Sequence, residues 1–142
     1  MTSINKSTVC LSLLFAISAC NTNKQLTDQD YPLYTSYSIE NLTNYPLSLN
    51  SSLNPQLAPL SIEQFQGTIA PGERRNILEL VDMSQASNPP STSFKQLNVK
   101  ANLGEGMRTV YQQIDDQDWQ YTLPANSKEN YLLRLADADL AL

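Results

Sequence analysis

The sequence predicts an all-β fold, a small antiparallel β-sandwich of about seven or eight strands, and three observations favour it. The clearest is the segment Gln96 to Leu103, in which apolar and polar side chains alternate with the period of two of a half-buried strand. Turn signals recur at short intervals along the chain. No segment beyond residue 30 keeps the 3.6-residue period of an amphipathic helix, so the domain is predicted to be built from strands.

Eight segments have the alternation, or the aromatic and β-branched composition, that predicts a strand. In chain order they are Tyr34 to Asn41, Tyr45 to Ser51, Leu60 to Gln66, Asn76 to Val81, Gln96 to Leu103, Arg108 to Ile114, Trp119 to Leu123 and Tyr131 to Leu135. Between the fourth and fifth strands, Asn88-Pro89-Pro90-Ser91 interrupts any ladder and predicts an exposed loop. The preceding segment, Val81 to Ala86, has room for a short helical turn.

Turn chemistry separates these strands. The sequence Ala70-Pro71-Gly72-Glu73 fits a type II turn, because proline fixes the first central φ and glycine supplies the positive φ of the second. The sequences Gly104-Glu105-Gly106 and Asp115-Asp116-Gln117-Asp118 are predicted to be hairpin connections. The two hairpin connections are therefore expected to join strands that are neighbours in one sheet.

The first twenty residues resemble a bacterial lipoprotein signal with its lipobox. Lys6 gives a positive n-region, Val9 to Ile17 is an apolar h-region, and Ser18-Ala19-Cys20 supplies small residues before a cysteine. A core helix or a membrane span is the structural alternative. The eleven residues from Val9 to Ala19, however, would extend only ~16 Å as a helix, about half of the ~30 Å hydrocarbon core of a bilayer.

This resemblance implies a signal peptide over residues 1–19 and a lipid anchor at Cys20. The anchor would be a thioether-linked diacylglycerol, with an N-acyl chain such as palmitate added after cleavage, and it would tether the chain to the membrane. Asn21, which follows the cysteine in place of aspartate, favours the outer membrane. We expect residues 20–33 to be a flexible polar tether and residues 34–142 to form the sandwich domain.

Composition excludes several classes of chemistry. The chain has no histidine, so a Ser-His triad and a zinc site with imidazole ligands are ruled out. Cys10 would leave with the signal and Cys20 would carry lipid, which leaves no free thiol and no disulfide. The formal net charge of -5 argues against a nucleic-acid partner. We therefore predict a non-enzyme with no catalytic residue, no bound metal and no cofactor apart from the lipid on Cys20.

The order of segments behind the lipobox carries a second resemblance. In chain order the segments are Leu47 to Pro55, Ala58 to Gln66 and Ile69 to Leu80, followed by the lone Trp119 and the closing strand Tyr131 to Leu135. They resemble the first strand and Asn-Pro loop, the Pro-led second strand, and the Pro-Gly-Glu-Arg-Arg turn and strand of the type VI secretion system outer-membrane lipoproteins, the TssJ family. The chain departs from that family at Gly67 to Ile69, where the family has a longer segment, and at Tyr31 to Asn44, which has no counterpart.

The resemblance implies a structural role. The chain would be held at the outer membrane, facing the periplasm, and would stabilise a trans-envelope secretion complex by binding the periplasmic part of an inner-membrane component. By position, the family's partner-binding loop corresponds to Ser52 to Pro59. The apolar anchors would be Leu53, Leu57 and Leu60, beside polar Asn54 and Gln56. The alternative is that these leucines pack onto the end of the sandwich.

Other features leave alternatives open. The aspartates of Asp115 to Asp118 suit a polar turn better than a Ca²⁺ site, because the spacing lacks the glycine and distal glutamate of an EF-hand loop. Arg74 and Arg75 either meet an acidic partner or discourage pairing at a strand entry. Two rival functions remain. One is a free-standing envelope lipoprotein that captures a ligand or a membrane through exposed aromatic residues, and the other is an enzyme that uses two carboxylates.

Overall fold

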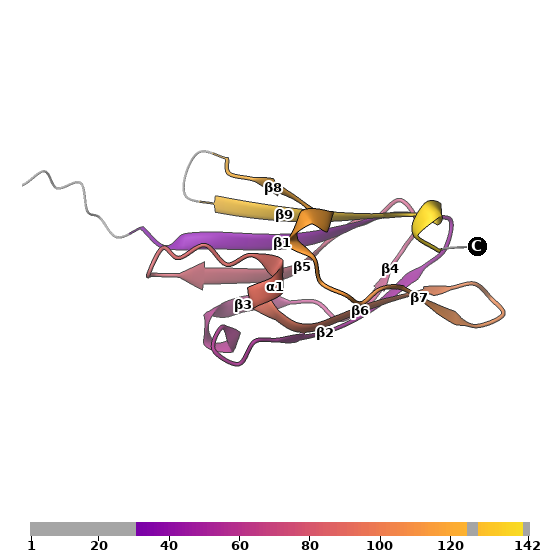
Figure 1. Cartoon of the computed structure of the whole chain (residues 1–142), viewed down its shortest axis with the longest axis horizontal. Coiled ribbons are helices and arrows are strands. Elements are labelled where there is room, and N and C mark those ends of the chain that lie inside the picture. Colours follow the sequence, from indigo (N-terminus) through magenta and orange to yellow (C-terminus); the bar gives the residue numbers. More distant parts are fainter. Residues whose placement is uncertain (1–30, 125–127, 141–142) are drawn as a thin grey trace, which may run out of the picture.

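A computed structural model describes residues 31–124 and 128–140. The described chain folds into two facing β-sheets, which confirms the all-β sandwich (Figure 1). The predicted signal peptide, Cys20 and most of the predicted tether lie outside the described residues. In the part that is described, no helix is long and apolar enough to cross a membrane.

The larger sheet has five strands in the order β3-β5-β1-β9-β8. Their bounds are β1 Leu33–Leu42, β3 Ser61–Gln64, β5 Arg74–Asp82, β8 Trp119–Thr122 and β9 Lys128–Ala136. The central strand β1 contains the segment Tyr34 to Asn41, which was predicted to be a strand. Leu33 is already part of β1, one residue before the expected start of the domain.

The smaller sheet has four strands in the order β4-β2-β6-β7. Their bounds are β2 Leu47–Leu53, β4 Gly67–Ile69, β6 Phe94–Asn102 and β7 Met107–Tyr111. The three-residue strand β4 was not predicted, because Gly67 and its neighbours are too few to show an alternation. It raises the number of strands within the described residues to nine.

One strand pair departs from the antiparallel expectation. Strands β1 and β9 pair in parallel, with Tyr34 opposite Lys128 and Leu42 opposite Ala136, whereas the other strand pairs are antiparallel. The first and last strands of the sandwich therefore run side by side in the same direction (Figure 1). We call the end of the sandwich at which both begin the tether end, and the other the opposite end.

The core lies between the sheets and is built from the alternating residues of both. Its fully buried side chains include Tyr37, Ile39, Leu47, Ile69, Ile77, Leu80, Leu97, Val99 and Leu133. Aromatic rings fill the centre. Tyr37 stacks on Tyr131 at 5.4 Å and meets Phe94 edge-on at 5.3 Å between ring centroids. Such aromatic pairs stabilise a core beyond the area they bury.

Two predicted turns are confirmed. Gly72 has a φ of 75°, and the Glu73 amide donates to the Ala70 carbonyl at 3.0 Å, as a type II turn requires. Gly104 has a φ of 82° in the hairpin between β6 and β7, where the Leu103 amide donates to the Gly106 carbonyl at 3.0 Å. Glycine is favoured at both positions because it adopts positive φ without a steric penalty.

The turn predicted at Asp115 to Asp118 is not a hairpin. Its flanking strands, β7 and β8, belong to different sheets, and Asp116–Asp118 forms the 3₁₀ turn η2. Facing sheets lie ~10 Å apart, so the chain needs a longer crossing than a hairpin provides. Local turn signals could not reveal which sheet each flanking strand joins.

The loop predicted to be exposed at Asn88 to Ser91 is also corrected. Asn88 is buried, and Pro90–Ser93 forms the short helix α1, whose first position suits proline. The helical turn lies there and not at Val81 to Ala86, because β5 continues to Asp82. The reason is tertiary: the hydroxyl of Tyr37 donates to the Asn88 carbonyl and lies 2.7 Å from Ser93 Oγ, which holds this segment against the core.

Candidate functional site

The predicted partner loop, Ser52 to Pro59, lies at the tether end. It leaves β2 after Leu53, which pairs with Phe94, and continues into the 3₁₀ turn η1, Ala58–Leu60. Strand β3 then begins at Ser61, opposite Leu80 and close to the end of β5. Figure 1 shows the loop at the same end of the sandwich as the start of β1.

Hydrogen bonds of Asn54 hold the loop in one shape. The Asn54 amide donates to the Ser93 carbonyl at 2.9 Å, and its side-chain nitrogen donates to the Thr92 carbonyl at 3.2 Å. Its side-chain oxygen accepts from the Gln56 amide at 3.1 Å, and its carbonyl accepts from the Leu57 amide at 2.9 Å. One asparagine therefore ties the loop both to itself and to α1, as Asx turns do.

The three leucines proposed as anchors do not project freely. Leu53, Leu57 and Leu60 are half-buried and pack against the core cluster. Only the exposed part of each side chain remains for a partner, while much of its apolar surface already stabilises the fold. The exposed residues of the loop are Ser52, Pro55, Gln56, Ala58 and Pro59. A contact surface here would thus consist mainly of Pro55, Gln56 and Pro59, together with the exposed part of each leucine.

A buried polar cluster lies behind the same end, and the sequence did not predict it. The Glu129 side chain, only 4% exposed, accepts from Ser87 Oγ at 2.8 Å and from the Tyr121 hydroxyl at 3.1 Å. Thr35 Oγ1 donates to its second oxygen at 3.3 Å. Glu129 faces inward because it lies on the same face of β9 as the core residues Tyr131 and Leu133. Its neighbour Thr35 is revealed only by the pairing of β1 with β9.

Asp82 is a second acid at this end and is 7% exposed. Its Oδ1 accepts from the Ser84 hydroxyl at 2.6 Å and from the Ser84 amide at 2.7 Å, and its Oδ2 accepts from the Asn88 side chain at 3.2 Å. The hydroxyl of Ser84 is the main cause that lowers the pKa of Asp82 below its ordinary value, and burial opposes it. The carboxylate is thus stabilised in its ionised form and closes the turn after β5.

We expect Asp82→Asn to weaken the dependence of stability on pH. A carboxylate whose pKa is lowered on folding stabilises the fold above its unfolded pKa, and that stabilisation is lost as the pH falls through its folded pKa. Urea unfolding from about pH 7 down to about pH 3 should therefore show a smaller loss of stability in Asp82→Asn than in the wild type. Near neutral pH the variant should be less stable by about 1–3 kcal/mol, because the introduced amide can offer a donor toward Asn88 in place of an acceptor. Equal pH dependence in both proteins would show that Asp82 is not linked to folding.

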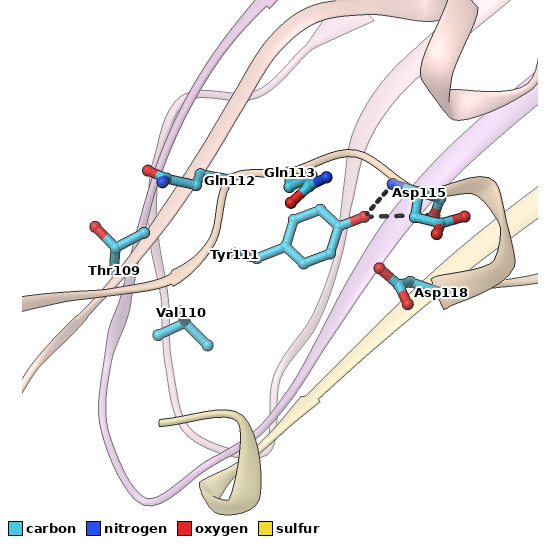
Figure 2. Close-up of a pocket in the computed structure, with 7 residues that line it drawn as sticks. All are labelled: Thr109, Val110, Tyr111, Gln112, Gln113, Asp115 and Asp118. Atoms are coloured by element: carbon cyan, nitrogen blue, oxygen red, sulfur yellow. Dashed lines mark hydrogen bonds between the residues drawn. The ribbon is translucent and has the colours of Figure 1, made fainter. Parts of the chain in front are cut away.

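A shallow depression of about 580 Å³ lies beside β7 (Figure 2). Figure 2 shows Tyr111 at its centre, with Asp115 and Asp118 near the hydroxyl and Thr109 and Gln112 toward the other side. The Tyr111 hydroxyl accepts from the Asp115 amide at 3.2 Å and from the indole nitrogen of Trp119 at 3.2 Å. Burial raises the pKa of Tyr111, so this hydroxyl is a neutral structural link between β7 and η2.

The carboxylates of the 115–118 segment are engaged in local structure. Asp115 accepts from the Gln117 amide at 2.9 Å, and Asp116 accepts from the amide and hydroxyl of Ser91 at 2.7 Å and 2.6 Å. Across residues 31–124 and 128–140, no three acidic or sulfur ligands gather as a metal site needs. The polar-turn interpretation accounts for these contacts.

The arginines after the type II turn are partly accounted for by contacts within the chain. Arg75 forms an ion pair with Glu73, and its guanidinium lies 5.0 Å from the centre of the Phe65 ring. Arg74 is exposed and stands opposite Glu40 across the β1–β5 pair. These contacts suit a charged strand entry.

The tyrosines divide between core and surface. Tyr37 and Tyr131 are buried, Tyr45 and Tyr111 are half-buried, and Tyr31, Tyr34 and Tyr121 are exposed. Which tyrosines lie at the tether end depends on which strands begin and end there.

Comparison with protein-family models and with curated proteins finds no match to this chain.

Proposed function

We propose that the chain is a lipid-anchored envelope lipoprotein that docks and stabilises a type VI trans-envelope secretion complex. The lipid on Cys20 would hold it at the outer membrane, and the loop Ser52 to Pro59 would bind the periplasmic part of an inner-membrane component. The proposal is supported by the order of sequence motifs behind the lipobox and by a sandwich that begins soon after the cysteine.

The observation that carries the docking role is the hydrogen-bonded shape of the loop. Asn54 fixes the loop against α1, so the exposed Pro55 and Gln56 are held in one arrangement. A preorganised loop loses little conformational entropy when it binds, and more of the contact energy appears as affinity. Prolines at both flanks of the contact surface reduce that entropy further.

The loop can be tested with a pair of variants that separate binding from folding. Gln56→Arg changes an exposed side chain, so it should leave the thermal melt nearly unchanged. It should weaken binding to the purified periplasmic domain of the inner-membrane component on the order of tenfold, which corresponds to about 1.4 kcal/mol. Calorimetry would measure the affinity, and circular dichroism would follow the melt.

Two further variants interpret the result. Gln113→Arg introduces the same change at an exposed glutamine beside β7 and should bind like the wild type. Leu57→Asp places a charge among side chains packed on the core, so it should lower stability by about 2–4 kcal/mol. Unaltered binding by Gln56→Arg would reject the loop as the contact surface and would favour the free-standing envelope lipoprotein.

A further inference from the structure

Exposed apolar side chains gather at the tether end of the larger sheet. Four of them, which we call the tether-end patch, are Tyr31, Tyr34, Met83 and Leu123, with exposed fractions of 61%, 38%, 62% and 59%. Leu42 and Met107 are the large apolar side chains exposed at the opposite end. The larger exposed group at the tether end is therefore a candidate contact surface.

Strand registers bring the patch together from distant parts of the sequence. Leu33 pairs with Asp82, which sets the start of the described chain beside Met83 at the end of β5. The Gln85 side chain donates to the Tyr31 carbonyl at 3.0 Å, so the turn after β5 is joined to that start. On the other side, Leu123 follows the end of β8, which pairs with the first half of β9. Figure 1 shows these strand ends together, on the side from which β1 emerges.

Charge is distributed unevenly between the two ends. The acids nearest the patch, Asp82 and Glu129, are buried and hydrogen-bonded. Two of the exposed acids lie at the opposite end, where Glu105 stands in the β6–β7 hairpin and Asp139 in the last 3₁₀ turn, Asp137–Leu140. The other exposed acids of the described residues lie between the two ends, on β3 (Glu63) and at η2 (Asp115 and Asp118). An exposed carboxylate loses solvation as it approaches an apolar phase, so the tether end can approach lipid at a lower free-energy cost than the opposite end.

The length of chain before the patch restricts what can cover it. Ten residues separate Cys20 from Tyr31. A coil of that length averages about 18 Å end to end. The ten residues of β1 extend the sandwich by roughly 33 Å in the other direction. A lipid anchor on Cys20 would therefore keep the tether end near the membrane, and turning the opposite end toward the membrane would need an almost fully stretched chain of about 36 Å.

We propose that the tether-end patch lies on the lipid surface, with Met83 and Leu123 in contact with the headgroup region. This inference rests on the proposed lipid anchor and adds an orientation to it. The tether end faces the membrane, so the loop Ser52 to Pro59 lies at the end nearest to it. Tyrosine suits such a position, because its ring is apolar and its hydroxyl is polar. A partner of the loop would then be met at the membrane surface.

Single-cysteine variants of the lipidated full chain test the orientation. The mature protein would have no free thiol, since Cys10 is removed and Cys20 is acylated, so an introduced cysteine is the only site of labelling. Met83→Cys labels the tether end, and Met107→Cys, 52% exposed in the wild type, is the matched control at the opposite end. Each protein carries an environment-sensitive fluorophore in phosphatidylcholine vesicles that contain a nitroxide-headgroup lipid.

The label at position 83 should lose most of its fluorescence to the nitroxide and shift to the blue, while the label at position 107 should change little. Equal quenching at both positions, or none at either, in protein that floats with the vesicles would overturn the orientation and leave the anchor intact. Failure of the wild-type protein to float with the vesicles would overturn the proposed lipid anchor itself, and the orientation with it. A circular dichroism spectrum identical to that of the wild type verifies that each labelled variant is folded.

Discussion

Replacing Tyr37 with alanine should lower the free energy of unfolding by about 3–5 kcal/mol, the cost of removing a buried aromatic side chain. Tyr37 is fully buried at the centre of β1. Its ring contacts Tyr131, Phe94 and Trp119, which come from both sheets and from late positions in the chain. The variant would therefore lose contacts that join the two sheets, in addition to the area that it exposes.

The hydroxyl of Tyr37 contributes separately, and Tyr37→Phe isolates it. This variant keeps the ring but removes one hydrogen-bond partner of the Asn88 carbonyl and of Ser93 Oγ. Ser93 Oγ still donates to the Asn88 carbonyl at 3.2 Å. Because no group is left unpaired, the loss of this hydrogen bond should cost about 0.5–1.5 kcal/mol. Burial also raises the pKa of Tyr37, so its hydroxyl stays neutral and donates at physiological pH.

Thermal unfolding followed by circular dichroism would measure both effects. For a domain of this size each kcal/mol shifts Tm by roughly 4–8 °C, so Tyr37→Ala should melt about 15–30 °C below the wild type. The Tm of Tyr37→Phe should lie between those of Tyr37→Ala and the wild type. Thr109→Ala, at an exposed position of β7, is a control that should change Tm little. A Tyr37→Ala protein that melts with the wild type would contradict the central position of this ring.

Replacing Cys20 with serine should abolish membrane attachment. A hydroxyl cannot form the thioether that carries diacylglycerol, and the lipid accounts for nearly all of the expected membrane affinity, at about 0.8 kcal/mol for each buried methylene. The precursor should remain uncleaved at Ala19, because cleavage of this signal class follows lipidation. The sandwich itself should fold normally, since its first strand begins at Leu33.

Metabolic labelling with a palmitate analogue would measure the lipid, and flotation with membranes would measure attachment. The wild type should carry label and float, whereas Cys20→Ser should carry none. Cys10→Ser is the matched control, because Cys10 lies inside the predicted signal and should be dispensable. Label retained on the Cys20→Ser protein, or absent from the wild type, would reject the lipobox.

Much of the fold could be predicted from local patterns. Alternation and composition located eight of the nine described strands to within a few residues: β1, β2, β3, β5, β6, β7, β8 and β9. Proline and glycine located the turn at Gly72 for an equally local reason, since the backbone angles of that turn restrict which residues can occupy it. Strand β4 escaped prediction because three residues are too few to show a period.

The candidate site was less predictable. Sequence position predicted that the loop Ser52 to Pro59 is the contact surface. The sequence does not show, however, whether an apolar residue in a loop faces solvent or the core. The structure packs Leu53, Leu57 and Leu60 on the core, which moves the exposed surface of the loop to Pro55 and Gln56. The burial of Glu129 could not be predicted from the sequence, because its hydroxyl donors come from three separate segments, at Thr35, Ser87 and Tyr121.

By itself, the sequence determined that the domain is built from strands, because periodicity and turn chemistry act over a few neighbouring residues. Only the tertiary structure decided which strands are neighbours and that β1 and β9 run in parallel. It also decided that the tether-end patch lies at the end where β1 begins. The physical reason is that sheet pairing joins residues up to about a hundred positions apart, such as Thr35 and Glu129, and the free energy that selects each pairing comes from the whole core. Strand pairing of this kind therefore cannot be predicted from a local sequence pattern.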